Sequence, residues 1–257
     1  MTDHEAYLFD LQGYLVVPQA ISPSLLTQLN GAIDSAEALS DAAAAAHNIP
    51  RPYVDTANKY AQLGERAGAG LGDYGCNMLP YGGPFEDLID LPTTLPLVEE
   101  MIGDPCRLDA MSFLSRHHHG AFRFHHGYAE LLPYSEYAFS DGSFDCVSVK
   151  VAYALTDVGV EDGCFAVIPG SHKSAFGNPL VGEVPDARHP LVEPIPCRGG
   201  DAIIFSEDLS HGAVENRGER VRRTLFYSYA PGSTLPGAAC WTQPQISRPA
   251  PRSAAGA

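Results

Sequence analysis

The sequence has 257 residues, of which 45% are hydrophobic and 9% aromatic, so it can bury a sizeable core as one domain. Its formal net charge of −15 argues against a nucleic-acid polymer as partner, because phosphate contacts require clustered lysine and arginine. No run approaches the ~18 consecutive apolar residues of a membrane span, and the first residues lack a signal pattern. We therefore expect a cytoplasmic protein without a membrane partner.

The N-terminal part favours helices. Residues 7–17 predict a short helix, with a strand after Gly13. Residues 21–39 carry a proline near their start and apolar residues at helical spacing (Leu25, Leu29 and Ile33), which predicts an amphipathic helix.

A Gly-rich stretch separates these helices from the next one. Residues 60–84 are rich in glycine and polar residues, which predicts a long loop and not a core element. Residues 91–103 predict another short helix, closed by Gly103. The Gly-rich segment 74–88 is typical of either a lid over a pocket or an ordinary surface loop.

From about residue 106 onward the pattern favours strands. Short runs rich in β-branched and aromatic residues alternate with turn signals at 106–114, 144–155, 164–170, 200–205 and 222–230. They predict a mainly β fold, a sandwich or barrel with the N-terminal helices on its outside. We expect a single domain over residues 1–245 and a disordered tail over 246–257.

Two adjacent histidines stand in the alternating run 122–131, "FRFHHGYAEL". On a strand, residues i and i+2 share a face, so His125 and Gly127 would point the same way and His126 the other way. Non-haem iron sites combine a histidine, an acid two residues on and a second, distant histidine, which leaves coordination positions open. His211 is a candidate for that distant ligand.

Arginines that follow His211 suit a keto-acid co-substrate, because a buried guanidinium grips a carboxylate in bidentate fashion. Arg222 lies eleven residues after His211, and Arg223 is its rival. Neighbouring strand residues face opposite ways, so one of the two should reach a pocket, and the spacing favours Arg222. Arg116 and Arg123 are further candidates for a pocket lining.

Three segments in order, "FDLQGYLVVPQAIS", "VKVAYALTDVGVEDGCFAVIPGSHKSAFGNP" and "GGDAIIFSEDLSHGAVENRGERVRRTLFYSYAPG", closely resemble the phytanoyl-CoA dioxygenase family. The resemblance covers most of residues 7–231, and "DGCFAVIPGSHK" is among its most specific parts. It implies a double-stranded β-helix (jelly roll) and an oxygenase that uses Fe(II), 2-oxoglutarate and O2.

Residue by residue, the resemblance makes His125 the first iron ligand, His211 the second, and Arg222 the anchor for the distal carboxylate of 2-oxoglutarate. The departure is Gly127, where the family usually has aspartate. Losing this carboxylate makes the metal site more positive by one unit and opens one coordination position, which chloride can fill.

The sequence resembles iron-dependent aliphatic halogenases, which have glycine or alanine at that position. This resemblance implies chlorination of an unactivated C–H bond in a small-molecule natural-product precursor, and one such branch acts on deoxyadenosine-type nucleotides. The sequence carries no signal for an oligomeric state.

Three alternatives stay open from the residues alone. In the first, another carboxylate supplies the third ligand of a hydroxylase; the candidates are Glu130, Glu136, Asp141 and Asp145. In the second, His126 is the ligand and Tyr128 takes the position of the acid. In the third, the jelly roll binds a ligand without redox chemistry.

Overall fold

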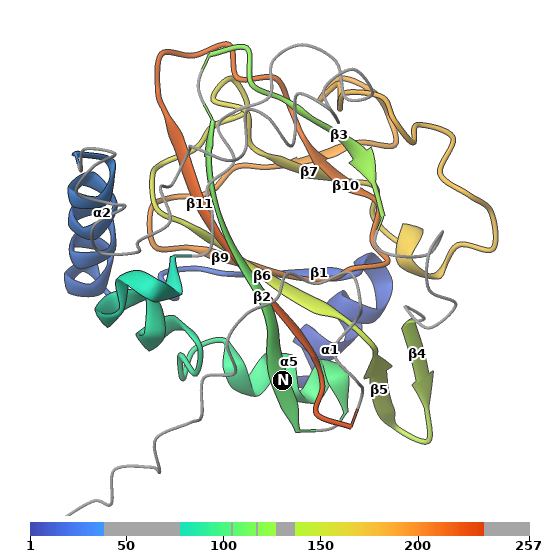
Figure 1. The fold of residues 1–257 in the computed structure, drawn as a ribbon. Coiled ribbons are helices and arrows are strands. Elements are labelled where there is room, and N and C mark those ends of the chain that lie inside the picture. The colour runs from blue at the N-terminus through green and yellow to red at the C-terminus, as the bar shows by residue number, and fades with distance from the viewer. Residues whose placement is uncertain (39–77, 104, 117, 127–136, 234–257) are drawn as a thin grey trace, which may run out of the picture.

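The computed structural model describes residues 1–38, 78–103, 105–116, 118–126 and 137–233. Within them the chain forms two antiparallel sheets packed face to face, with helices on one side (Figure 1). The predicted mainly β, jelly-roll fold is confirmed. Residues 246–257 and the end of the predicted domain 1–245 lie outside the described residues, so the proposed domain boundary stays a prediction.

The larger sheet has five strands, and its long central strand β11 pairs with β2 on one side and β6 on the other. In sheet order the strands are β1 (Tyr14–Val17), β9 (Ala202–Ser206), β6 (Val149–Ala154), β11 (Arg222–Pro231) and β2 (Cys106–Arg116).

The smaller sheet has four strands and faces the larger one. In sheet order they are β3 (Phe122–His125), β10 (His211–Ala213), β7 (Phe165–Val167) and β8 (Glu193–Ile195). A separate hairpin is formed by β4 (Tyr137–Ser140) and β5 (Ser143–Cys146).

The helices form where the sequence predicts them. They are α1 (Asp3–Gln12), α2 (Pro23–Ala38) and α5 (Leu95–Ile102). The short 3-10 helices η1 (Leu79–Tyr81) and η2 (Gly83–Leu88) precede α5, and η4 (Ser171–Lys173) follows β7. Helix α1 ends at Gly13, whose φ of 85° is the left-handed conformation that glycine adopts without strain. Among the described residues, no helix is both long and apolar enough to cross a bilayer.

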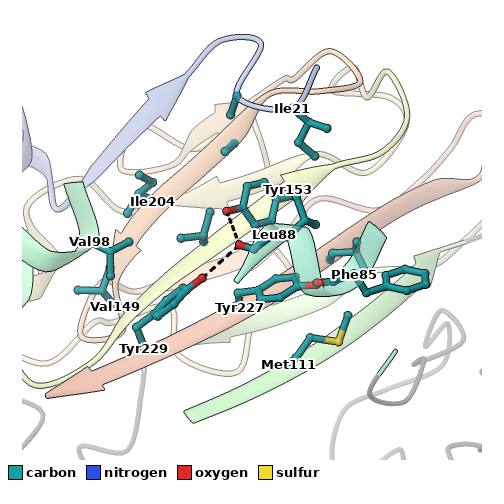
Figure 2. Close-up of a cluster of buried hydrophobic side chains, with 14 of the residues drawn as sticks. Ile21, Phe85, Leu88, Val98, Met111, Val149, Tyr153, Ile204, Tyr227 and Tyr229 are labelled. Atoms are coloured by element: carbon teal, nitrogen blue, oxygen red, sulfur yellow. Dashed lines mark hydrogen bonds between the residues drawn. The ribbon is translucent and has the colours of Figure 1, made fainter. Parts of the chain in front are cut away.

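The main hydrophobic core lies between the helices and the outer face of the larger sheet, as Figure 2 shows. Its tyrosines also bond to the segment before α5: the Tyr227 hydroxyl donates to the Phe85 carbonyl (2.6 Å) and the Tyr229 hydroxyl to the Ile89 carbonyl (2.8 Å). Phe85 and Leu88 are completely buried.

The prediction that residues 60–84 contain no core element is therefore wrong for the described part. Met78 and Leu79 are buried against the sheet although glycines and prolines break the helical period around them. Residues 78–88 pack on the outer face of the sheet, away from the space between the two sheets, so this part of the chain is not a lid over that space. The rest of the suggested lid lies outside the described residues.

Candidate active site

A pocket opens between the two sheets, lined by side chains of β2, β3, β6, β7, β10 and β11. His125, His211 and Arg222 all line it. The structure thus brings His125 together with two residues from a distant part of the sequence. His126 follows the end of β3 and does not line the pocket.

The two histidines face each other across neighbouring strands. His125 of β3 and His211 of β10 are direct partners in the antiparallel register, and their ring centroids lie 4.1 Å apart. After this pair the register shifts by one residue, so that Ala213 pairs with Phe122 and not with Arg123. This bulge lets Phe122 and His125 line the same pocket although they are three residues apart and would face opposite sides of a regular strand.

Backbone carbonyls fix the tautomer of both rings. His125 Nδ1 lies 3.0 Å from the Arg123 carbonyl, and His211 Nδ1 lies 2.7 Å from the Leu209 carbonyl. A carbonyl only accepts, so each Nδ1 carries the hydrogen and each Nε2 keeps its lone pair. Metal-binding histidines use this same arrangement, in which the second nitrogen donates to an oxygen.

Desolvation keeps the pair neutral. It lowers the pKa of His125 to about 4, and burial together with the neighbouring His125 holds the pKa of His211 well below its usual value. Neutral imidazole is the form that binds a metal ion. The ring of His211 also packs against Phe205 and Phe165, with centroids 4.8 and 5.5 Å away, which restricts its orientation.

Arg222 begins β11 and is held inside the pocket. Its Nη1 donates to the Gly163 carbonyl (2.7 Å) and its Nε to the Thr224 hydroxyl (3.0 Å), and the residue is 4% exposed. Arg223 points away from the pocket and forms ion pairs with Asp34 and Glu37 of α2, at 2.7 and 2.9 Å. The geometry therefore favours Arg222 over Arg223 as a pocket residue.

Of the two further arginine candidates, Arg116 lines the pocket and Arg123 does not. Sequence reasoning missed Lys150, which also lines the pocket and forms an ion pair with the buried Glu207 at 2.7 Å. The sequence pattern could have indicated this residue, because residues i and i+2 of a strand share a face. Lys150 therefore faces the same way as Ala152, while the residues that alternate with them face outward.

The third metal ligand is not found in the described part of the chain. Within it, no group of three or more histidine, cysteine, aspartate or glutamate side chains is placed to hold a metal ion. Asp141 and Asp145 are exposed on the β4–β5 hairpin. Gly127, Tyr128, Glu130 and Glu136 lie outside the described residues, so their predicted or alternative roles stay predictions.

A jelly roll that holds a neutral histidine pair and a buried arginine in one pocket has the features of a non-haem iron oxygenase. The chain belongs to the phytanoyl-CoA dioxygenase (PhyH) family, whose model matches residues 9–224. This is a family of Fe(II)/2-oxoglutarate-dependent oxygenases.

Relatives in sequence are named dioxygenases. Dioxygenase trt7 of Aspergillus terreus is 37% identical over 90 residues, which cover 35% of this chain and 29% of that protein. Dioxygenase lolE1 of Epichloe uncinata is 31% identical over 83 residues, which cover 32% of each. The matched segments thus span less than a third of the length of these relatives.

Solved structures share the fold at low sequence identity. HygX from Streptomyces hygroscopicus, with nickel and 2-oxoglutarate bound, superposes with a TM-score of 0.71 at 20% identity over 92% of this chain and 89% of that one. The non-haem α-ketoglutarate-dependent epimerase SnoN from nogalamycin biosynthesis gives a TM-score of 0.63 at 19% identity over 89% of this chain and 82% of that one.

Proposed function

We propose that this protein is an Fe(II)/2-oxoglutarate-dependent halogenase that replaces a C–H hydrogen of a small natural-product precursor by chlorine. The observation that carries the proposal is Gly127, two residues after His125, where related enzymes usually have an aspartate ligand. It is supported by the histidine pair and by the lack of a substitute carboxylate beside that pair in the described residues.

The residues present fit the iron and the co-substrate. His125 and His211 would hold Fe(II) through Nε2, while Arg222 would hold the distal carboxylate of 2-oxoglutarate. Iron, when bound, supplies the activation of O2 at the expense of oxidative decarboxylation of 2-oxoglutarate. Phe122 contacts the ring of His125 and Phe165 that of His211, so this side of the pocket is apolar.

Charge balance favours a halide at the position that glycine leaves open. The charges of Fe(II) and of the 2-oxoglutarate dianion cancel, and the histidines are neutral. Chloride therefore restores the single negative charge that aspartate would contribute. The overall reaction would consume the substrate C–H, chloride, a proton, 2-oxoglutarate and O2. It would yield the C–Cl product, succinate, CO2 and water.

A small natural product is the substrate class that the neighbours support. HygX has been solved with hygromycin B bound, and SnoN with nogalamycin RO. A deoxyadenosine-type nucleotide is one candidate within this class, suggested by the resemblance of Gly127 to one halogenase branch.

A chloride titration under anaerobic conditions tests the proposal. Protein reconstituted with Fe(II) and 2-oxoglutarate should show a weak visible charge-transfer band that chloride shifts saturably. A band that ignores chloride would instead indicate a hydroxylase with a relocated carboxylate, and folded protein without a band would indicate a binding protein.

Replacing the glycine gives the matching variant test. Gly127→Asp should abolish the chloride-induced shift, because the added carboxylate occupies the halide position and supplies the same charge. Gly177→Asp is the control: it adds the same charge at an exposed glycine with open space beside its Cα, and should leave the shift unchanged. If chloride still shifts the band in Gly127→Asp, the assignment of the halide to this position is wrong.

A further inference from the structure

Lys150 brings a positive charge to the part of the pocket that holds the histidine pair. It lies on β6 directly opposite Phe205 of β9, and both side chains face the space between the sheets. The Phe205 ring in turn contacts the His211 ring, with 4.8 Å between their centroids. One aromatic residue therefore separates the lysine strand from a proposed iron ligand, and Lys150 lines the same pocket as that ligand.

Lys150 lies at the other end of the pocket from the arginines. Its partner in β11 is Ser228, six residues after Arg222, which is a separation of about 20 Å along a strand that rises 3.3 Å per residue. Desolvation is the main cause of the lowered pKa of His125, and the positive charge of Lys150 lowers it further, by more than the charge of Arg116 does. The histidine pair thus lies between the two ends, within electrostatic reach of the lysine.

A buried carboxylate holds the lysine ammonium group from behind. Lys150 Nζ lies 2.7 Å from each carboxylate oxygen of Glu207 and donates to Oε1. The Lys150 side chain is 23% exposed and that of Glu207 is 4% exposed, and of the two only Lys150 lines the pocket. An ammonium group has three N–H donors, so this ion pair leaves Lys150 with donors for a ligand in the pocket.

A lysine beside a metal site needs a physical reason, because its charge repels Fe(II) and opposes binding of the metal. Glu207 offsets part of this repulsion. An anion on the metal would turn the rest into attraction and would accept a charge-assisted hydrogen bond. We infer that Lys150 is a halide-binding residue, which donates a hydrogen bond to the chloride on the iron, and that Glu207 positions its ammonium group. The inference rests on the proposed halogenase function.

The affinity of the Fe(II)/2-oxoglutarate complex for chloride tests this inference without turnover. At saturating 2-oxoglutarate and without oxygen, the saturable shift of the charge-transfer band gives a dissociation constant for chloride. Lys150→Met, which keeps the apolar stem, should raise this constant by about tenfold or more, as expected for a lost charged hydrogen bond. Lys150→Arg keeps the charge and should recover most of the affinity. It also provides the test if Lys150→Met does not fold.

Glu207→Gln gives a test of opposite sign. It removes the negative charge that offsets Lys150, so the ammonium group should attract an anion more strongly and the dissociation constant for chloride should fall. A lysine that only supported the fold would not bind chloride more tightly when its partner is replaced. Lys173→Met is the control: this lysine also pairs with a carboxylate, that of Asp10 at 2.9 Å, but does not line the pocket, and chloride binding should not change.

The outcomes separate this inference from the proposed function. A wild-type band that is absent or ignores chloride would overturn the halogenase proposal and the role of Lys150 with it. A wild-type chloride response that keeps its dissociation constant in Lys150→Met would overturn the role of Lys150 alone. Weaker chloride binding in both Lys150→Met and Glu207→Gln would also overturn it, because the ion pair would then be structural.

Discussion

At the scale of single residues, three histidines with lowered pKa values differ in what their Nδ1 atoms contact. In His125 and His211 this atom donates to a backbone carbonyl, and Nε2 is left for a ligand. In His172 the roles are reversed: Nε2 lies 3.1 Å from the Asp10 carbonyl, and Nδ1 is buried beside Gly13 with no hydrogen-bond partner in the described part of the chain. His172 is therefore a structural residue, held in its neutral form.

This environment predicts a pH-dependent stability. Burial lowers the pKa of His172 to about 4, while a histidine in the unfolded chain titrates near pH 6.5. The unfolded state binds the proton first, so the contribution of His172 is complete above about pH 6.5 and is lost as the pH falls toward 4. The free energy of unfolding of wild type relative to His172→Gln should fall by up to about 2 kcal/mol between pH 7 and 5.

Urea unfolding at several pH values measures this difference. His4→Gln, at an exposed histidine of α1, is the control and should track the wild type at every pH. If the free energies of unfolding of wild type and His172→Gln change in parallel with pH, His172 titrates normally in the folded protein.

At the scale of elements, the site depends on how closely β3 approaches β10. A Cβ built on Gly212 would lie 2.6 Å from the Phe122 carbonyl oxygen and 3.0 Å from Cγ of Pro185. Glycine between His211 and Ala213 thus permits the close approach that sets the two histidine rings 4.1 Å apart.

Gly212→Ala should therefore weaken metal binding without abolishing the fold. The added methyl group meets backbone, which cannot rotate away, so β3 must shift and carry His125 from its partner. We expect the affinity for Mn(II), measured by calorimetry, to fall by about tenfold or more, a cost of at least about 1.4 kcal/mol. Gly177→Ala, at an open position, should bind like the wild type; equal affinity in Gly212→Ala would show that the spacing of the strands does not limit the site.

Much of this architecture could be predicted from local pattern. Gly13 and Gly103 mark helix ends, and the β-branched runs mark the long strands. The three-residue strands β8 and β10 were missed because so short a segment has no recognisable period. The face on which Arg116 lies depends on its register with Arg222, and that pairing forms between segments about a hundred residues apart, which no local pattern reports.

At the scale of the whole molecule, β11 serves two surfaces at once. Its residues Arg222, Thr224 and Phe226 face the space between the sheets, whereas Leu225, Tyr227 and Tyr229 face the helices. The outward set anchors the segment before α5 through its hydroxyl groups (Figure 2). The inward set lines the space between the sheets.

The two surfaces should respond independently to mutation. Tyr227→Phe leaves the buried Phe85 carbonyl without this donor and should lower the free energy of unfolding by about 1–3 kcal/mol. The affinity for 2-oxoglutarate should stay at the wild-type value, because the ring faces away from the pocket. Tyr7→Phe, at a tyrosine that is 64% exposed, is the control and should change neither quantity. A parallel loss of affinity and stability in Tyr227→Phe would show that the faces are coupled.

The alternation of β11 bears on how such a protein diversifies. In such a strand the even-numbered side chains face the pocket and the odd-numbered ones pack in the core. Substitutions at the first set can change the pocket while the second set keeps the chain folded. Selection can then alter what the pocket binds, one residue at a time, without first rebuilding the core.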